Sequence, residues 1–444
     1  MKRLLLLAVA LALALLAWQL PAQTEARHGL ALLVLIAALW ITEAIPLTFT
    51  ALLVPVLGVA LGLTGTTDAL SGFAHPVIAL FLGGFALAAA LSAQGIDRWI
   101  AGRVLLLSRG RPLPAALLLS GAAALLSMWI SNTATTAMML PVALGLAGTP
   151  DNGFPRYRIF LLLALAWGAN LGGIATLVGS PPNAIVAAAL DWQFNDWLRV
   201  GLPVSLVLLP LALATLYGAV RPETTVPRVD TGRPMPFPHS REAWLTLIIF
   251  AVTVLLWTLG APLARALGID KDFDSWVALL AMVLLGLSGV VKWETVESHA
   301  NWGVLLLFGG GITLSALMES SGASAFMAQG LGDVLPAGRD WLVYLAIAAF
   351  ALLLTELASN TASAALLVPL FMPVATHLGA DPAVAAVLVG TSASCALMLP
   401  VATPPNALVF GSGAMPQSAM VRTGFYASVL AAAVLPLLVP ALMN

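Results

Sequence analysis

Charged residues are scarce in this chain. Asp, Glu, Lys and Arg make up only 9% of its 444 residues, whereas soluble domains carry about 25%. Hydrophobic residues account for 60% of the sequence, and the mean hydropathy is +0.99. Several apolar runs, such as 77–93 and 302–317, approach the roughly 20 residues that a helix needs to cross the hydrocarbon layer. We therefore expect an integral membrane protein.

Cysteine is almost absent as well. Cys395 is the single cysteine, which excludes an intramolecular disulfide and a cysteine metal cluster. The net charge of −1 argues against nucleic acid as a partner. The apolar runs do not alternate with polar residues, as the strands of a membrane barrel would. The sequence thus predicts an all-α integral membrane protein.

The first twenty residues can be interpreted in two ways. MKRLLLLAVALALALLAWQL has a basic start and a long apolar run, as a cleaved signal peptide does. Its 17-residue apolar stretch, 4–20, is longer than the usual hydrophobic region of a signal peptide. We therefore favour a retained first helix, with 1–28 as an N-terminal membrane helix and loop.

Basic residues in the loops set the expected orientation. Eleven spans are expected near 4–20, 29–46, 48–64, 77–95, 159–190, 200–220, 243–260, 275–291, 302–319, 383–411 and 423–442. When the N-terminus lies in the cytoplasm, 14 basic residues fall on the inner side and 5 on the outer side. This bias is typical of a multi-pass protein of the inner (plasma) membrane. The Pro-rich stretch 221–242 then becomes a cytoplasmic linker.

A polar triplet interrupts the apolar sequence twice. Ser-Asn-Thr stands at 131–133, in the centre of the apolar segment 113–147, and again at 359–361, in the segment 341–376. One arm of either segment, roughly 13 to 18 residues, is short for a crossing. We expect two re-entrant hairpins with the triplets at their tips near the midplane. Non-helical backbone is tolerated there only beside protein or a watery cavity, so each tip marks a candidate site.

Further motifs recur at nearly the same spacing. FLGGFALAAALSAQG at 81–95 resembles FGGGITLSALMESSG at 308–322, and VGSPPNAIV at 178–186 resembles VATPPNALV at 401–409. The expected repeats, 29–220 and 243–444, each contain five crossings and one hairpin. Because five is odd, the two repeats must have opposite orientations. Inverted repeats with broken helices are typical of transporters whose site lies at the midplane.

The two prolines of each PPNA motif predict a break in a helix. Proline removes a backbone donor and clashes with the preceding turn, so carbonyls near Gly179 and Ala402 lose their helical partners and can bind a cation. The helix starts after each break and each tip present N–H groups and a positive dipole end to an anion. An N-cap or a kink would explain either motif alone. The recurrence of both motifs in both halves favours a binding site.

The paired SNT triplets, the paired PPNA breaks, ITEAIPL at 41–47 and the Gly-rich helix starts resemble the divalent anion/sodium symporters. This family includes sodium-coupled dicarboxylate and citrate transporters, and the resemblance covers nearly the whole chain. It implies an inverted-repeat fold with eleven membrane helices and two re-entrant hairpins. It also implies a homodimer in which a transport domain moves past a scaffold domain, as in an elevator.

The resemblance further implies which residues bind. The first sodium site would use Ser127, Ser131, Asn132 and Gly179, and the second Thr355, Ala358, Ser359, Asn360 and Ala402. The dicarboxylate would contact Ser131, Asn132, Thr133, Ser180, Ser359, Asn360, Thr361, Thr403 and Pro404. Ser127 and Thr355 each stand four residues before the triplet serine, so each shares a helix face with it.

The expected function is sodium-coupled uptake of divalent anions. Succinate, malate and fumarate are the favoured C4-dicarboxylates, although neutral Ser, Asn and Thr donors do not rank them against tartrate, citrate or sulfate. No basic residue is expected at a tip or a break. Two bound sodium ions would therefore supply the positive charge that a dianion needs, and anion affinity would depend on sodium through linkage.

Several alternatives stay open. Glu356 is either a proton-coupling carboxylate, as intramembrane ionisable groups often are, or a hydrogen-bonding structural group, since its counterpart in the first repeat is Met128. A sodium-independent dicarboxylate exchanger would use the same fold. A channel would favour basic rings around its pore, and an intramembrane enzyme would need a base beside Ser131 or Ser359, so both are disfavoured. Segment 97–109 is expected to lie on the inner membrane surface.

Overall fold

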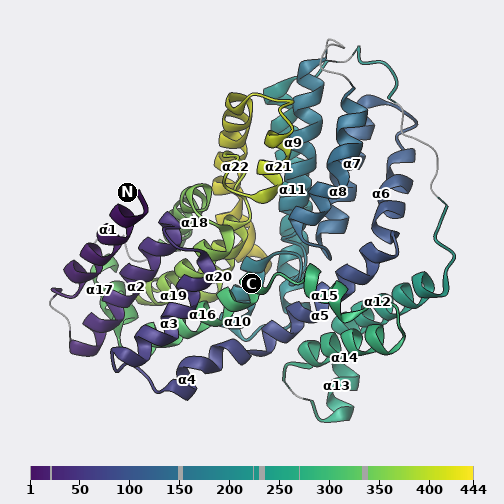
Figure 1. Ribbon diagram of the computed structural model, residues 1–444. Helices are drawn as coiled ribbons and strands as arrows, with labels where there is room; N and C mark the ends of the chain where they lie inside the picture. Colours follow the sequence, from purple (N-terminus) through teal and green to yellow (C-terminus); the bar gives the residue numbers. More distant parts are fainter. Residues whose placement is uncertain are drawn as a thin grey trace.

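The computed structural model describes residues 2–20, 23–148, 154–223, 225–229, 236–269, 271–332 and 339–443, and all secondary structure in these ranges is helical (Figure 1). The helices up to the linker are α1 Lys2–Ala17, α2 Thr24–Thr42, α3 Leu47–Ala60, α4 Thr66–Ser71, the 3₁₀ helix η1 Gly72–Ala74, α5 Pro76–Ala93, α6 Ile96–Leu106, α7 Pro112–Ser127, α8 Asn132–Ala147, α9 Pro155–Gly172, α10 Pro181–Leu190 and α11 Phe194–Val220.

The helices after the linker follow a similar order. They are α12 Arg241–Leu259, α13 Ala261–Leu267, α14 Phe273–Leu287, α15 Trp293–His299, α16 Trp302–Ser320, α17 Ala323–Gly332, α18 Asp340–Leu357, α19 Asn360–His377, α20 Pro382–Ala393, α21 Pro404–Gly411 and α22 Gln417–Met443. The sequence did not predict the short helices α4, α13, α15 and α17. The expected surface segment 97–109 is largely the helix α6.

Seven helices of the described chain are long and apolar enough to cross a membrane. Six of them coincide with expected spans, and the seventh, α18, is the first arm of the second hairpin. Three further expected spans, α1, α3 and α14, are shorter apolar helices. The two remaining spans, 159–190 and 383–411, are broken helices, since α9 is separated from α10 and α20 from α21 at the PPNA motifs. The protein is an all-helical, multi-span membrane protein.

Both expected hairpins are present as pairs of packed helices. α7 and α8 are joined by the turn at 128–131, and α18 and α19 by the turn at 358–359. Each hairpin packs against the first arm of its own broken helix, α7 and α8 on α9, and α18 and α19 on α20. Glycine permits the closest of these approaches, because a Cβ added at Gly172 would collide with the backbone of Ala124.

Helices of the two repeats pack together in two equivalent pairs. α5 packs on α14, and α16 packs on α3. In the first pair Gly83 lies against the carbonyl of Ala278, and in the second Gly310 lies against the carbonyl of Ala51. The two glycines are 227 positions apart, and so are the two alanines. The same helix contact is therefore built twice.

Phe81 and Phe308 mark where the repeats meet. These two residues occupy the same position in the matched 81–95 and 308–322 motifs, and their rings touch edge to face with centroids 4.9 Å apart. A contact between equivalent residues must lie on the axis that relates the two repeats. α11 and α22, the last helices of each repeat, pack together in the same way.

Candidate functional site

Both Ser-Asn-Thr triplets start the second arm of a hairpin. Ser131 precedes α8 with φ −56° and ψ 142°, and its side chain accepts a hydrogen bond from Ala134 N (3.2 Å). Ser359 precedes α19 with nearly the same backbone, φ −56° and ψ 135°. The N-cap interpretation is thus correct for Ser131, whose hydroxyl satisfies one of the free N–H groups of the helix start.

Each tip also brings a hydroxyl to an asparagine five residues further on. The Ser127 hydroxyl lies 2.5 Å from the Asn132 side-chain amide in the first tip, and Thr355 Oγ1 lies 2.8 Å from Asn360 Oδ1 in the second. Ser127 and Thr355 are fully buried, at the ends of α7 and α18. The repeated sequence therefore produces a repeated contact between a hydroxyl and an asparagine amide.

The Asn132 side-chain amide lies among three oxygen atoms of the first tip. In the orientation that satisfies them, its Nδ2 donates to Ser127 Oγ (2.5 Å), Gly179 O (3.2 Å) and Ala169 O (3.3 Å). The first tip therefore gathers a hydroxyl, an amide and two backbone carbonyls beside the break between α9 and α10.

The second tip differs in its backbone partner. Thr355 Oγ1 lies 2.8 Å from the carbonyl oxygen of Ala393, at the end of α20. Ala402 is buried in the same break, where its N–H donates to Leu399 O (3.2 Å). The carbonyl that contacts Thr355 is thus that of Ala393, and the role expected for the Ala402 carbonyl stays a prediction.

The asparagine of each PPNA motif holds its break in shape, a role that the sequence analysis missed. Asn183 Nδ2 donates to the carbonyls of Gly173 (2.8 Å) and Thr176 (2.7 Å). Asn406 Nδ2 donates to the carbonyls ten and seven residues before it, Ala396 and Leu399, both at 3.1 Å. These offsets are the same in both repeats. The signal was visible in the motif, whose prolines alone had been interpreted.

Each break is also tied to its own tip, with different chemistry in the two repeats. In the second repeat the Glu356 carboxylate accepts hydrogen bonds from the backbone N–H groups of Leu397 (2.8 Å), Met398 (2.9 Å) and Leu399 (3.0 Å). In the first, the Thr176 hydroxyl donates to the carbonyl of Met128, the counterpart of Glu356. The three contacts agree with the hypothesis that Glu356 is a hydrogen-bonding structural group.

Polar side chains connect the two breaks across the repeat boundary. Asn170 Nδ2 on α9 donates to Thr403 Oγ1 (3.1 Å) and to Asn406 Oδ1 (3.3 Å). Ser180 and Ser394 hydroxyls lie 3.5 Å apart. In addition, α21 packs on α8 and α9, and α10 packs on α19. Each broken helix therefore contacts the hairpin of the other repeat, which brings the expected site residues of both repeats together.

The expected substrate residues differ in how accessible they are. Ser131, Thr133 and Pro404 are exposed, and Asn132, Ser359 and Asn360 are half-buried. Ser180, Thr361 and Thr403 are buried.

Neither lysine nor arginine occurs in 112–155, 159–198 or 340–421, which contain both tips and both breaks. The described chain also holds no cluster of three His, Cys, Asp or Glu side chains suited to a metal ion. Apart from the Glu356 carboxylate, the available chemistry is that of neutral oxygens and N–H groups.

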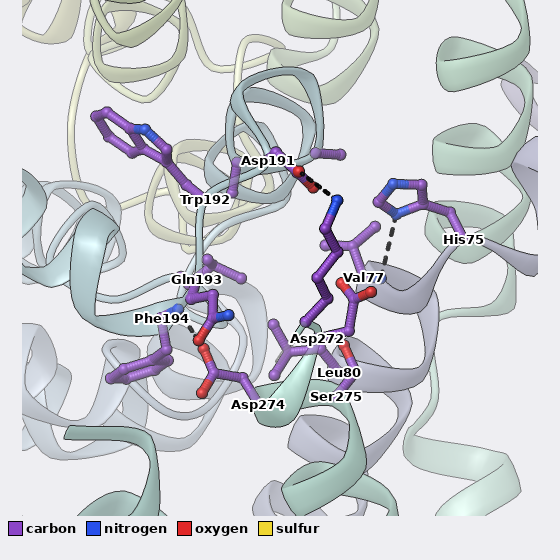
Figure 2. Close-up of a pocket in the computed structure, with 14 residues that line it drawn as sticks. His75, Val77, Leu80, Asp191, Trp192, Gln193, Phe194, Asp272, Asp274 and Ser275 are labelled. Atoms are coloured by element: carbon purple, nitrogen blue, oxygen red, sulfur yellow. Dashed lines mark hydrogen bonds and ion pairs between the residues drawn. The ribbon is translucent and has the colours of Figure 1, made fainter. Parts of the chain in front are cut away.

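A small pocket lies between the ends of α5, α10 and α14, and no Ser-Asn-Thr residue lines it (Figure 2). It is lined by His75, Asp191, Lys271 and Asp274, among others, and Asp274 Oδ2 accepts a hydrogen bond from Phe194 N (2.5 Å). Its volume of about 60 Å³ is far below the roughly 300 Å³ at which ligand pockets begin. The pocket is therefore too small to hold a dicarboxylate as it stands.

Paired hairpins, paired broken helices and a buried polar centre between inverted repeats define a secondary transporter, not an enzyme. The chain belongs to the citrate transporter family, because the sequence model described as "Citrate transporter" matches residues 37–390 and again residues 275–443. These two matches overlap, as they do in a chain with an internal repeat.

Relatives extend over nearly the full length. An uncharacterized transporter of Haemophilus influenzae is 48% identical over 414 residues, 91% of this chain and 89% of the relative. A sodium-dependent dicarboxylate transporter, SdcS, of Staphylococcus saprophyticus is 30% identical over 449 residues, 92% and 85% of the two chains. The crystal structure of the Alcanivorax borkumensis YdaH transporter has the same fold, with a TM-score of 0.58 and 17% identity over 84% of this chain and 86% of that one.

Proposed function

We propose that this transporter couples the uptake of a divalent anion to sodium, with C4-dicarboxylates such as succinate, malate and fumarate as its substrates. The observation that carries the proposal is the duplicated tip. Ser127 with Asn132, and Thr355 with Asn360, each place a hydroxyl and a side-chain amide beside a backbone carbonyl at the end or break of a helix. The relationship to a sodium-dependent dicarboxylate transporter supports the same coupling.

Charge balance explains why sodium would be required. The segments that form the tips and breaks contain no lysine or arginine, so a dianion entering there would meet only neutral donors. Burying an unpaired charge is costly. A sodium ion at each tip would neutralise it. The first ion would be held by Ser127, Ser131, Asn132 and Gly179, and the second by Thr355, Ala358, Ser359, Asn360 and Ala402.

The anion would bind between the two tips. Ser131, Asn132, Thr133, Ser359, Asn360 and Thr361 would donate from the tips, and Ser180, Thr403 and Pro404 would line it from the breaks. The starts of α8 and α19 add N–H groups that favour negative charge. The starts of α10 and α21 begin with two prolines, which lack an N–H, so they add only the positive end of the helix dipole. Sodium and anion would then bind cooperatively, because each stabilises the other's site.

The overall transport scheme that fits this site is an elevator. The hairpins and broken helices, as one body, would carry the bound ions past a scaffold that includes the interlocked pairs α5–α14 and α3–α16. In this scheme the N-terminus is cytoplasmic, the repeats span 29–220 and 243–444 around the linker 221–242, and two copies of the chain associate in the inner membrane.

Uptake of labelled succinate into proteoliposomes, with and without an inward sodium gradient, tests the proposal. We expect sodium-dependent uptake with a Hill coefficient for sodium above one. Ser127→Ala and Thr355→Ala should each lower the apparent sodium affinity roughly fivefold, as expected for a lost hydrogen bond or ligand of about 1 kcal/mol. Ser120→Ala, which removes an equally buried hydroxyl from α7, serves as the matched control.

The same assay separates the two alternatives. A sodium-independent exchanger would take up succinate only against an internal dicarboxylate, and neither tip variant would change this uptake. A proton-coupled transporter would respond to a pH gradient and lose that response in Glu356→Gln. The three backbone hydrogen bonds to Glu356 favour a structural role for this residue and hence the sodium-coupled alternative.

A further inference from the structure

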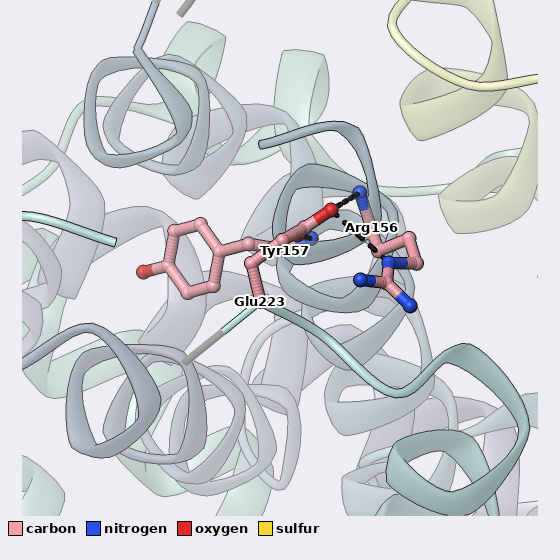
Figure 3. A network of polar contacts seen from close by, with 3 residues as sticks. All are labelled: Arg156, Tyr157 and Glu223. Atoms are coloured by element: carbon pink, nitrogen blue, oxygen red, sulfur yellow. Dashed lines mark hydrogen bonds and ion pairs between the residues drawn. The ribbon is translucent and has the colours of Figure 1, made fainter. Parts of the chain in front are cut away.

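An open groove between α11 and α22 has a basic mouth. Arg221 directly follows α11, Arg422 lies near the start of α22, and Arg156 lies in the first turn of α9. All three are exposed and line a groove of about 900 Å³. Glu223 pairs with Arg156 through Nε and Oε1 at 3.1 Å (Figure 3), so the mouth keeps a net positive charge.

The floor of the groove is apolar and follows α22. Tyr426, Val429 and Ala433 line it, and Tyr426 and Val429 are about half exposed, at 49% and 52%. From Arg422 to Ala433 the helix rises roughly 16 Å at 1.5 Å per residue. This length is close to the hydrocarbon of one bilayer leaflet, roughly 15 Å or half of a 30 Å core.

The position of the groove in the membrane follows from the two long helices that form it. α11 and α22 are both long and apolar enough to span, and the arginines stand at the end of α11 and the beginning of α22. The charged mouth therefore lies at the level of the phospholipid headgroups and the apolar floor at the level of the acyl chains. A soluble anion would use the mouth alone, whereas an amphiphile would use both parts.

Arginine suits phosphate in particular. Its planar guanidinium donates two parallel hydrogen bonds to phosphate oxygens, and basic pockets between membrane helices attract anionic headgroups. Arg422 already donates from Nη2 to the carbonyl of Ala219 in the last turn of α11 (2.9 Å), which fixes the side chain across the mouth. We propose that this groove binds one anionic phospholipid, with its phosphate on Arg221 and Arg422 and an acyl chain along Tyr426, Val429 and Ala433.

Native mass spectrometry of the purified full-length protein, in neutral detergent titrated with dioleoylphosphatidylglycerol, tests the site. We expect one lipid to be retained per chain at low concentration. Arg221→Gln with Arg422→Gln should raise the half-saturating lipid concentration about tenfold, because each basic residue near a membrane surface contributes separately to the attraction. The control, Arg98→Gln with Arg103→Gln, removes the same charge from exposed positions on α6 and should leave binding unchanged.

Two further arms identify the ligand. Dioleoylphosphatidylcholine should not be retained, and inorganic phosphate should not displace the bound phosphatidylglycerol. Val429→Ser should weaken lipid binding while the arginines remain in place, and it provides a second variant if the double substitution does not fold. Three outcomes would overturn the proposal. They are an equal half-saturating lipid concentration in the groove and control variants, equal retention of the two lipids, and displacement of phosphatidylglycerol by inorganic phosphate.

Discussion

Asn183 and Asn406 each stabilise a stretch of open backbone with one side-chain amide. Helical residues satisfy their carbonyls with N–H groups four residues along, and the breaks lack these partners. The asparagines replace them from within the following helix, at Gly173 and Thr176 in one repeat and at Ala396 and Leu399 in the other. Because both asparagines are fully buried, water cannot take over the carbonyls if the amide is lost.

Asn183→Ala and Asn406→Ala should each destabilise the protein by about 2–3 kcal/mol, because each leaves buried carbonyls without a donor. The melting temperature in detergent, followed by tryptophan fluorescence, measures this effect. Asn195→Ala, at a half-buried position in the first turn of α11, should melt close to the wild type. If Asn183→Ala and Asn406→Ala both melted at the wild-type temperature, the side-chain amides would not be needed to stabilise the breaks.

Glu356→Gln separates the structural role of the carboxylate from a proton-carrying one. Oε1 accepts from Leu397 and Met398, and Oε2 from Leu399. An amide keeps one acceptor oxygen but turns an N–H₂ group toward a third donor, at a cost of about 1–3 kcal/mol. We expect a lower melting temperature with sodium dependence of succinate binding retained at fixed pH. Loss of proton-driven uptake in a folded variant would reverse this assignment.

Among the helices, the close contacts of Gly83 and Gly310 should not tolerate a side chain. A Cβ at either position would collide with a backbone carbonyl, Ala278 or Ala51, which cannot rotate away. Gly83→Ala and Gly310→Ala should each lower the stability by about 1–3 kcal/mol through overpacking. Gly121→Ala, where a Cβ would meet open space, should raise the melting temperature slightly. Equal melting of all three variants would contradict the interlocked packing.

The docking of the linker onto α9 should depend on pH through Glu223. Its carboxylate accepts from Tyr157 N (2.7 Å) and from Arg156 N and Nε (3.2 and 3.1 Å) at the start of this helix. Burial alone would raise the pKa of Glu223, but these hydrogen bonds outweigh burial and lower its pKa. The ionised carboxylate therefore stabilises the fold above its unfolded pKa, and this stabilisation is lost as the pH falls through the lower folded pKa.

Glu223→Gln should consequently melt at a lower temperature than the wild type at pH 7. The difference between the two proteins should shrink as the pH is lowered below about 4.3, the ordinary pKa of glutamate. Glu242→Gln, an exposed substitution at the start of α12, should show no such pH-dependent difference. A difference that stays constant from pH 7 to pH 3.5 would exclude the ionised contact as its cause.

The elements that were predictable are those fixed by local sequence. The hairpins 113–147 and 341–376 coincide with α7–α8 and α18–α19, since apolar arms and a helix-starting serine define them without reference to the rest of the fold. The short helices α4, α13, α15 and α17 were not predicted, because helices of this length depend on tertiary packing rather than on their own periodicity. The contact of Thr355 with Ala393 likewise follows from how α18 packs on α20.

For the whole molecule, the opposite orientation of the repeats has a direct test. Arg111 and Arg339 precede the two hairpins at equivalent positions, 228 residues apart, and both are exposed. The native Cys395 is fully buried, so an impermeant maleimide should label the added cysteine and not Cys395. Arg111→Cys should react with an impermeant maleimide from the cytoplasmic side and Arg339→Cys from the outer side. Labelling of both from one side would contradict the inverted arrangement.

The crossed packing of each broken helix on the opposite hairpin also has a consequence for biosynthesis. α8 contacts α21, yet α21 begins at Pro404 and α8 ends at Ala147. At roughly 5–20 residues per second, on the order of 10 to 50 s of translation separate them. During that interval the first hairpin has the break of its own repeat beside it but not α21, so water, lipid headgroups or the insertion machinery must cover the face of α8 that α21 later contacts until the ribosome has nearly finished.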